Sequence, residues 1–155
     1  MPNNKRTSAI SSLKIGDIYM IDFNGIGSEQ SGYRPALVIQ NNTGNVYSPN
    51  VIVLPITSSI KKTNQPTHVL ISSENSGLLK DSMVLCENPE CVSKNRLNKY
   101  ITSLNNEYMA KVAMAYLLAT SVISFVTPEL FITLQGKAND LNYINGYNKN
   151  EDYNA

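Results

Sequence analysis

The fold is determined by the stretch KIGDIYMIDFNGIGSEQSGYRPALVIQ, residues 14–40. Two apolar runs rich in β-branched and aromatic residues, 15–23 and 34–40, predict strands. Pro35 stands at the start of the second strand, where a missing N–H is tolerated. Between them, residues 24–33 contain three glycines and predict a long loop. Long loops in compact domains are usually functional, so this loop is the first candidate for a site.

Further short strands are predicted at 50–56, 67–71, 82–86 and 99–104. Turn-forming residues separate them, including NNTGNVYSPN at 41–50 and SSENSG at 72–77. Five or six strands at roughly this spacing predict a compact antiparallel sheet or barrel.

A single amphipathic helix is predicted after the last strand. Asn105 is a good N-cap, and Leu104 and Met109 are placed to form a hydrophobic staple. The residues that recur at helical spacing and are expected to pack on the sheet are Met109, Val112, Ala113, Tyr116, Leu117 and Thr120.

The two ends of the chain are predicted to lie outside the core. Residues 1–13 are expected to form a flexible polar arm, residues 14–120 the domain, and residues 121–155 a C-terminal extension. Within the extension, PELFITLQ (128–135) predicts one or two helical turns, and the polar residues 136–155 predict disorder. The uncharged run 112–128 approaches the length of a membrane span, but its polar second half favours a core helix and a packed connection.

Composition indicates a soluble globular protein, with 42% hydrophobic and 16% charged residues. A net charge of +1 offers little general attraction for nucleic acid, so any such affinity must come from local arrangement. Cys86, Cys91 and the lone His68 are too few and too spread for a zinc site, and we expect reduced thiols. The first residues lack an apolar segment of the secretory type, so we expect a cytoplasmic location.

Two polar residues at strand ends are the candidates for chemistry. Arg34 begins a strand after the glycine-rich loop, and Thr57 directly follows the strand 50–56. If these strands are neighbours, a guanidinium and a hydroxyl converge at one sheet edge, an arrangement suited to a phosphate. Two structural alternatives stay open: a surface salt bridge for Arg34 and a turn-closing hydroxyl for Thr57.

Several longer blocks resemble the MazF/PemK/Kid family of toxin endoribonucleases, especially its Gram-positive branch. The blocks are GDIYMIDF, GSEQSGYRPALVIQNNTGN, SPNVIVLPITSSIKK, QPTHV and GLLKDSMVLCE, followed by the late helix, and they cover about residues 14–119. The resemblance implies a mainly β fold, a small SH3-like antiparallel barrel with a C-terminal helix, shared by MazF, CcdB and Kid. It also implies a homodimer, a MazE-like antitoxin as partner, and no cofactor, metal or membrane.

The activity implied by the resemblance is metal-independent, sequence-specific cleavage of single-stranded RNA, in particular mRNA, by the toxin of a type II toxin-antitoxin system. Arg34 and Thr57 match the family's catalytic pair. The RNA 2′-hydroxyl attacks the adjacent phosphate, which leaves a 2′,3′-cyclic phosphate and a 5′-hydroxyl. Arg34 would stabilise charge and donate a proton to the leaving oxygen, while Thr57 would orient the phosphate or relay a proton.

Four further residues are implied to contact the RNA. Ser28 and Glu29 match loop residues that border its path, and Asn88 stands where the family usually has a base-reading glutamine. Tyr33 either stacks on a base or packs in the core.

The chain departs from the family pattern in one place. After Glu87 the family tends to continue QIRTIDK, whereas this chain has NPECVSK at 88–94. Glu90 replaces a basic residue and Pro89 is expected to alter the strand. A catalytically silent binding protein and a gyrase-directed toxin like CcdB therefore remain alternatives, although neither needs the pair Arg34 and Thr57.

Overall fold

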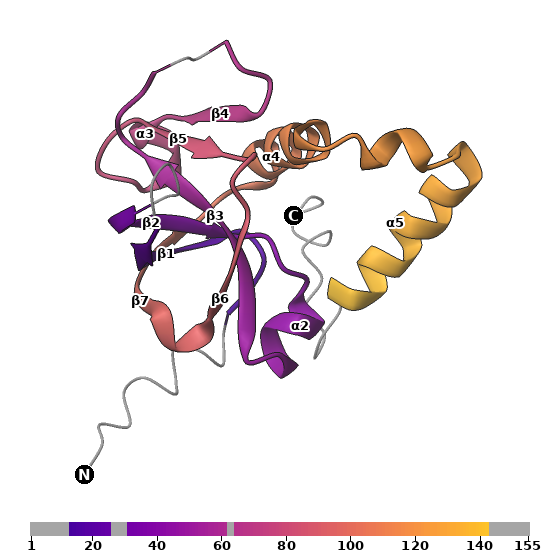
Figure 1. Ribbon diagram of the computed structural model, residues 1–155, viewed down its shortest axis with the longest axis horizontal. Helices are drawn as coiled ribbons and strands as arrows, with labels where there is room; N and C mark the ends of the chain where they lie inside the picture. Colours follow the sequence, from indigo (N-terminus) through magenta and orange to yellow (C-terminus); the bar gives the residue numbers. More distant parts are fainter. Residues whose placement is uncertain (1–12, 26–30, 62–63, 143–155) are drawn as a thin grey trace.

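A strongly bent antiparallel sheet forms the body of the molecule, with helices beside it (Figure 1). The computed structural model describes residues 13–25, 31–61 and 64–142. The strands are β1 (Asp17–Asn24), β2 (Ser31–Val38), β3 (Asn50–Thr57), β4 (His68–Ile71), β5 (Ser82–Leu85), β6 (Glu90–Ser93) and β7 (Leu97–Ser103). The helices are α2 (Asn42–Tyr47), α3 (Ser73–Ser76), α4 (Asn106–Ala119) and α5 (Pro128–Asn142), with 3-10 turns η1 (Lys94–Arg96) and η2 (Val122–Phe125).

Strand β3 is the centre of the sheet, whose order is β4-β5-β3-β2-β1-β7. It pairs with β2 along one edge, while β6 and β5 share the other edge, one after the other. A strand shared in this way bends the sheet, which agrees with the twist that strands adopt. The predicted mainly β architecture with a C-terminal helix is confirmed.

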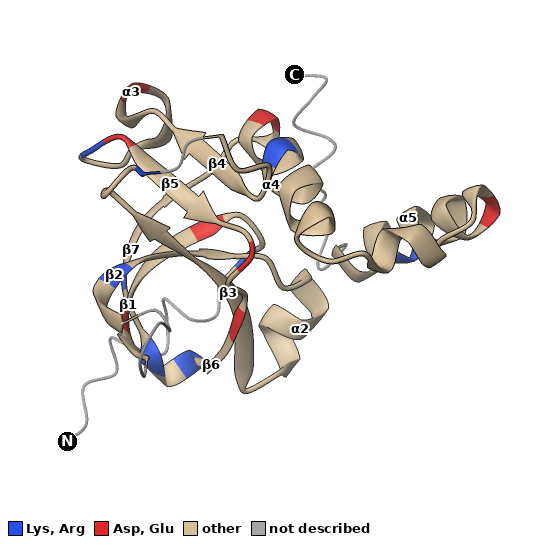
Figure 2. Ribbon diagram, turned by 45° about the horizontal axis from the view of Figure 1, so that its top comes forward, with Lys and Arg blue, Asp and Glu red and all other residues tan. Residues whose placement is uncertain are grey.

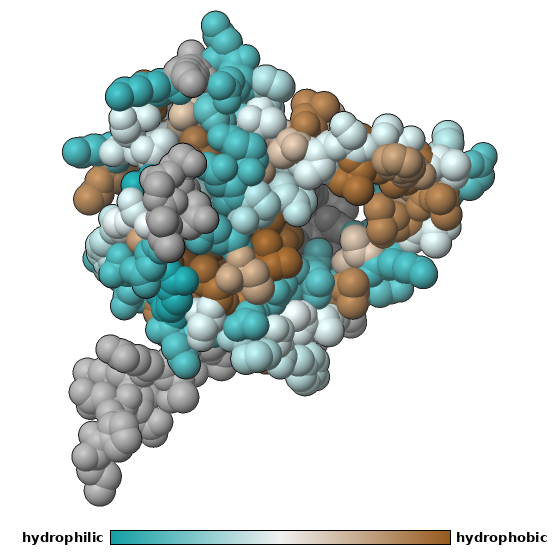
Figure 3. Space-filling model, in the orientation of Figure 1, coloured by the Kyte–Doolittle hydropathy of each residue, from teal (hydrophilic) through white to brown (hydrophobic). Residues whose placement is uncertain are grey.

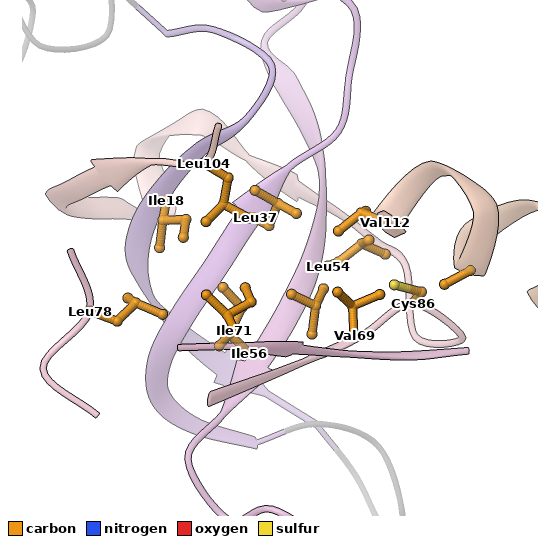
Figure 4. Close-up of a cluster of buried hydrophobic side chains, with 12 residues drawn as sticks. Ile18, Leu37, Leu54, Ile56, Val69, Ile71, Leu78, Cys86, Leu104 and Val112 are labelled. Atoms are coloured by element: carbon orange, nitrogen blue, oxygen red, sulfur yellow. The ribbon is translucent and has the colours of Figure 1, made fainter. Parts of the chain in front are cut away.

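Two cores lie on opposite faces of β1, β2 and β3. Successive residues of a strand point to opposite faces, so Ile18 and Leu37 enter one core while Tyr19, Ile21 and Ala36 enter the other. The first core lies between the sheet and α4 (Figure 4). The second is covered by β6, which contributes Val92, and by Leu13. Burial on both faces explains why these strands are nearly continuous apolar runs.

Helix α4 begins as predicted, and its packed face agrees with the prediction in part, because Met109 and Val112 contact the first core. The Asn105 side chain accepts a hydrogen bond from the Tyr108 N–H at 2.9 Å, which confirms the N-cap. Val112 and Ala115 are buried, whereas the predicted contact residue Ala113 is exposed. Tyr116 and Thr120 are exposed as well. The helix has apolar residues on all sides, so spacing alone could not fix the buried face.

Several elements before β7 differ from prediction. Residues 41–50, predicted as a turn, contain the helix α2, because the Asn41 side chain caps it by accepting from the Gly44 N–H. The strand β6 was not predicted, and it forms by pairing with β3. Strand β2 begins at Ser31, so the predicted loop is shorter at its end, and Leu13 is buried rather than part of a flexible arm.

The C-terminal extension is more helical than predicted. Helix α5 runs through Asn142, well beyond one or two turns, and contains no buried residue (Figure 1). Its last turn contacts α2: the Asn142 side chain accepts from the Asn42 N–H at 3.1 Å, and Thr43 Oγ1 donates to the Leu141 carbonyl at 2.7 Å. Residues 1–12 and 143–155 lie outside the described residues. None of the described helices has the length and apolar character needed to cross a membrane.

Candidate active site

The pairing of β2 with β3 brings Arg34 and Thr57 together. Ala36 is opposite Pro55 in the antiparallel register. Arg34 and Thr57 each lie two residues beyond this pair, along β2 and β3 respectively. The two strands are neighbours, which is the condition on which the expected convergence depended, and both residues are half-buried.

Both residues line one cleft of about 680 Å³. The cleft lies between the middle of β1, β2 and β7, the end of β3, and the segment between α3 and β5. Its lining residues are Met20, Tyr33, Arg34, Pro35, Ile56, Thr57, Ser58, Ser59, Gly77, Leu78, Leu79, Lys80, Ser82, Lys99, Tyr100 and Ile101. Tyr33 is 58% exposed, so it does not pack in the core.

The Arg34 side chain is oriented by its own strand. Its Nη2 donates a hydrogen bond to the Ser31 carbonyl at 2.7 Å. That bond turns the planar guanidinium within the cleft, and the fork of N–H groups matches the oxygen atoms of a phosphate. The geometry is therefore suited to binding a phosphoryl group.

The Thr57 hydroxyl closes a turn and can still act on a substrate. Its Oγ1 accepts a hydrogen bond from the Ser59 N–H at 3.1 Å, as the turn-closing alternative predicts. Because the oxygen is the acceptor in that bond, the hydroxyl hydrogen can be donated to a second group. The structural and the chemical interpretation of Thr57 are compatible.

Positive charge is concentrated in the cleft although the chain as a whole is almost neutral. Arg34, Lys80 and Lys99 line it, and none of the described lining residues carries a carboxylate. Charged residues are thinly scattered over the rest of the ribbon (Figure 2). Neither lysine could be predicted as a site residue from the sequence, because nothing in the local sequence distinguishes a lysine that lines a cleft from one elsewhere on the surface. Three cations that line one cleft favour an anionic ligand.

Not every predicted site residue reaches the cleft. Asn88 lies in the turn after β5, where its N–H donates to the Leu85 carbonyl at 3.2 Å. The cleft is lined by Ser82, at the opposite end of β5, and Asn88 is not among its lining residues. Ser28 and Glu29 lie outside the described residues.

The divergent stretch 88–94 has a structural role. Its strand β6 keeps four register pairs with β3 despite Pro89, and Val92 is buried in the second core. The Lys94 ammonium donates to the carbonyls of Gly44 and Asn45 at the end of α2. Burial lowers the pKa of Lys94. This lysine therefore supports α2 and is not part of the cleft.

Other reactive side chains lie away from the cleft. His68 Nε2 is 2.7 Å from Glu87 Oε1, an ion pair when the imidazole is protonated. Burial, followed by the nearby Glu87, raises the pKa of Cys86 to about 12, whereas Cys91 is exposed. Across the described ranges, no three His, Cys, Asp or Glu side chains form a group that could hold a metal ion.

Residues 14–118 match the family model described as the PemK-like, MazF-like toxin of type II toxin-antitoxin systems. The chain belongs to this family. The MazF-like region thus ends within α4, and helix α5 lies beyond it.

Relatives of known activity cover the same region. The MazF-like chain is 44% identical to Endoribonuclease EndoA of Bacillus subtilis over 114 residues. This aligned region is 73% of the chain and 98% of that protein. The chain is 46% identical over 101 residues to Endoribonuclease MazF of Staphylococcus saprophyticus, covering 64% of the chain and 84% of that protein.

Solved structures confirm the fold. A mycobacterial endoribonuclease in complex with its cognate antitoxin superimposes with a TM-score of 0.61 at 22% identity, over 72% of this chain and 97% of that one. MazF from Deinococcus radiodurans gives a TM-score of 0.60 at 22% identity, over 68% of this chain and 94% of that one.

Proposed function

We propose that this MazF-like toxin is a metal-independent endoribonuclease that cleaves single-stranded RNA, with mRNA as its cellular substrate, at a specific sequence. The observation that carries the proposal is that Arg34 and Thr57 line one cleft together with two further cations, Lys80 and Lys99. The two relatives, Endoribonuclease EndoA and Endoribonuclease MazF, support the same reaction class by name.

The cleft chemistry is transfer of the phosphoryl group to the neighbouring ribose oxygen. The 2′-hydroxyl loses its proton to solvent as its oxygen forms a bond to phosphorus, while the bond from phosphorus to the 5′-oxygen breaks. Arg34 stabilises the negative charge on the non-bridging oxygens and hydrogen-bonds the leaving 5′-oxygen, which takes up a proton. Thr57 donates its hydroxyl hydrogen to the phosphate and holds it in line. DNA lacks the attacking hydroxyl and is not cut.

The working unit in this proposal is a homodimer. The outer side of α4 exposes Met114 at 64% and Leu118 at 53%, and η2 continues this apolar surface with Val122 and Phe125 (Figure 3). Large exposed apolar patches mark interaction sites. Met114→Glu is expected to shift the chain from dimer to monomer in light scattering, whereas Lys111→Glu, on the same helix, is not.

The antitoxin in this proposal is a MazE-like protein whose extended acidic segment occupies the cationic cleft. Arg34, Lys80 and Lys99 supply the complementary charge. RNA and antitoxin would then compete for one surface, and toxin action would take place in the cytoplasm, where both occur. An acidic antitoxin peptide is expected to inhibit cleavage competitively, with a steep dependence on salt.

The structure favours this enzyme over a silent relative. The altered stretch 88–94, which kept the silent alternative open, forms β6 and the support of α2 and contributes no residue to the cleft lining. Retention of Arg34 and Thr57 likewise gives no support to a gyrase-directed toxin.

The deciding experiment incubates purified protein with long single-stranded RNA in excess EDTA. Wild type is expected to give discrete cuts with 5′-hydroxyl ends, mapped by primer extension. Arg34→Ala should cut at least about 100-fold more slowly, the typical effect of removing a group that stabilises a transition-state charge. Arg96→Ala is the matched control, because that guanidinium binds the Asp22 carbonyl and does not line the cleft. Intact RNA with retained binding would favour the silent relative.

A further inference from the structure

An exposed aromatic ring lies in the cleft beside the catalytic pair. Tyr100, on β7, lines the cleft and is 47% exposed. Aromatic side chains at this position of a strand usually pack into a core, and its partner across the sheet, Tyr19, does so with 3% exposure. Tyr100 therefore presents ring surface to the cleft that the rest of the described chain does not cover.

Two contacts fix the orientation of this ring. The Tyr19 and Tyr100 ring centroids are 5.6 Å apart at an interplanar angle of 70°, an edge-to-face pair. The Tyr100 hydroxyl lies 2.9 Å from Ser103 Oγ. An aromatic ring held from both ends loses little conformational freedom when it binds a ligand.

The hydroxyl contact is the end of a chain that reaches a buried carboxylate. Ser103 Oγ donates to Asp17 Oδ1, and the Lys14 N–H donates to Asp17 Oδ2 at 2.9 Å. Asp17 is only 6% exposed. Because Ser103 gives its hydrogen to Asp17, Tyr100 must donate to Ser103. The phenol hydrogen is therefore used in a hydrogen bond within the protein, and the face of the Tyr100 ring is the part that a ligand can contact.

The ring is within reach of the nucleotides that flank the cut phosphate. Strands β2 and β7 both pair with β1, where Ile21 faces Arg34 and Tyr19 faces Tyr100. Strand spacing and rise then place the Cα atoms of Arg34 and Tyr100 about 12 Å apart. Both side chains line the same cleft, so one short stretch of RNA can contact both.

We propose that Tyr100 forms a nucleobase subsite, in which a base of the bound RNA next to the cleaved phosphate stacks on the ring that Tyr19 and Ser103 hold in place. The inference rests on the proposed endoribonuclease function. We assign a nucleobase as the ligand because the cations of the cleft are suited to phosphates, whereas an aromatic ring is suited to the flat face of a base. Tyr100 is a binding residue here, and Ser103 is a positioning residue.

The test combines protein variants with abasic substrates. Tyr100→Leu removes the ring, whereas Tyr100→Phe and Ser103→Ala keep the ring and each remove the hydrogen bond that tethers it. Tyr47→Leu is the matched control, because Tyr47 is 79% exposed on α2 and does not line the cleft. An RNA with the mapped cleavage site is made with a single abasic nucleotide at each position in turn, and kcat/KM is measured for every pair.

One abasic position is expected to lower kcat/KM of wild type about 5- to 150-fold, the range for one stacked base. On intact RNA, the kcat/KM of Tyr100→Leu should be lower than that of wild type by the same factor, and an abasic nucleotide at that position should lower it no further. Abasic nucleotides at other positions should still lower the kcat/KM of this variant. Ser103→Ala and Tyr100→Phe, which both lose the hydrogen bond between Tyr100 and Ser103, should raise KM more than they lower kcat, whereas Tyr47→Leu should resemble wild type. A Tyr100→Leu enzyme that cuts within twofold of wild type, or that loses equally at every abasic position, would overturn the subsite.

Failure of the endoribonuclease function itself gives a different result, because wild type would then leave the RNA intact. In that case the proposed base-binding role of Tyr100 is still tested by measuring RNA binding. A 2-aminopurine base at each position of an RNA blocked by 2′-deoxy substitution is titrated with protein. Fluorescence quenching at one position by wild type but not by Tyr100→Leu supports the subsite, and equal or absent quenching contradicts it.

Discussion

Adding a methyl group at Gly77 is expected to destabilise the fold and disturb the cleft. Gly77 ends α3 in the left-handed conformation with φ of 80°, and it lines the cleft. A Cβ at this position would lie 2.7 Å from Thr102 Oγ1 and 3.0 Å from Thr102 Cβ. Thr102 belongs to β7 and is stiff about χ1, so it cannot rotate away without cost.

The expected loss has two parts. A residue with Cβ in the left-handed conformation costs about 1–2 kcal/mol, and forcing an overpacked contact costs about 1–3 kcal/mol more. We therefore expect Gly77→Ala to lower the free energy of unfolding by about 3 kcal/mol, out of the 5–15 kcal/mol that is typical of a domain. Thr102→Ala removes the nearer clashing atom, so the double variant should recover about 1 kcal/mol of the loss.

Urea unfolding of wild type, both single variants and the double variant measures these quantities, with the slope m as a check that the same surface is exposed. The reasoning is refuted if Gly77→Ala unfolds within about 0.5 kcal/mol of wild type, or if the two substitutions are additive to that precision. RNA cleavage by the folded Gly77→Ala protein should also be slower. The segment displaced by the new methyl group includes Lys80, which lines the cleft in wild type.

Three further outcomes are expected. Only Cys91 should react quickly with a thiol reagent at pH 8, because burial raises the pKa of Cys86 to about 12; two fast thiols in the native protein would contradict this. The Ser73 N–H, and then its hydroxyl, hold the pKa of Asp81 below its ordinary 3.8, so the stabilisation is present above pH 4 and lost as pH falls through the lowered pKa. Asp81→Asn should therefore lower the urea midpoint at pH 7, and the difference from wild type should vanish at strongly acidic pH; a constant difference would exclude this role. Deleting residues 128–155 should leave cleavage intact and speed amide exchange in α2, where Asn42 loses its partner, whereas loss of cleavage would show that α5 supports the cleft.

The parts of the fold that could be predicted are those with local signals. The strands around Ile18 and Leu37 are apolar on both faces, and the helix after Asn105 has a recognisable cap. Arg34 and Thr57 could be placed near one another because they belong to two successive strands that form an antiparallel pair, although Arg34 lies inside β2 and not at its start. These features depend on residues close in sequence.

The parts that escaped prediction depend on contacts between distant residues. Helix α2 is held by Lys94 and by Asn142 at its two ends, and β6 exists because β3 offers it an edge. The cationic wall of the cleft joins Lys80 and Lys99, which are separate in the chain. No pattern within one segment reports such a neighbourhood.

The cleft is lined by segments that are far apart in the sequence, so a truncated chain lacks part of it. Every lining residue lies between Met20 and Ile101, and the last of them belong to β7, a strand at the edge of the sheet that pairs with β1. A fragment that stops before Leu97 would still carry Arg34 and Thr57 but would lack the wall that holds Lys99 and Tyr100. During translation the cutting surface is therefore completed only when β7 has emerged and folded back onto the first strand, so a prematurely terminated product is inert.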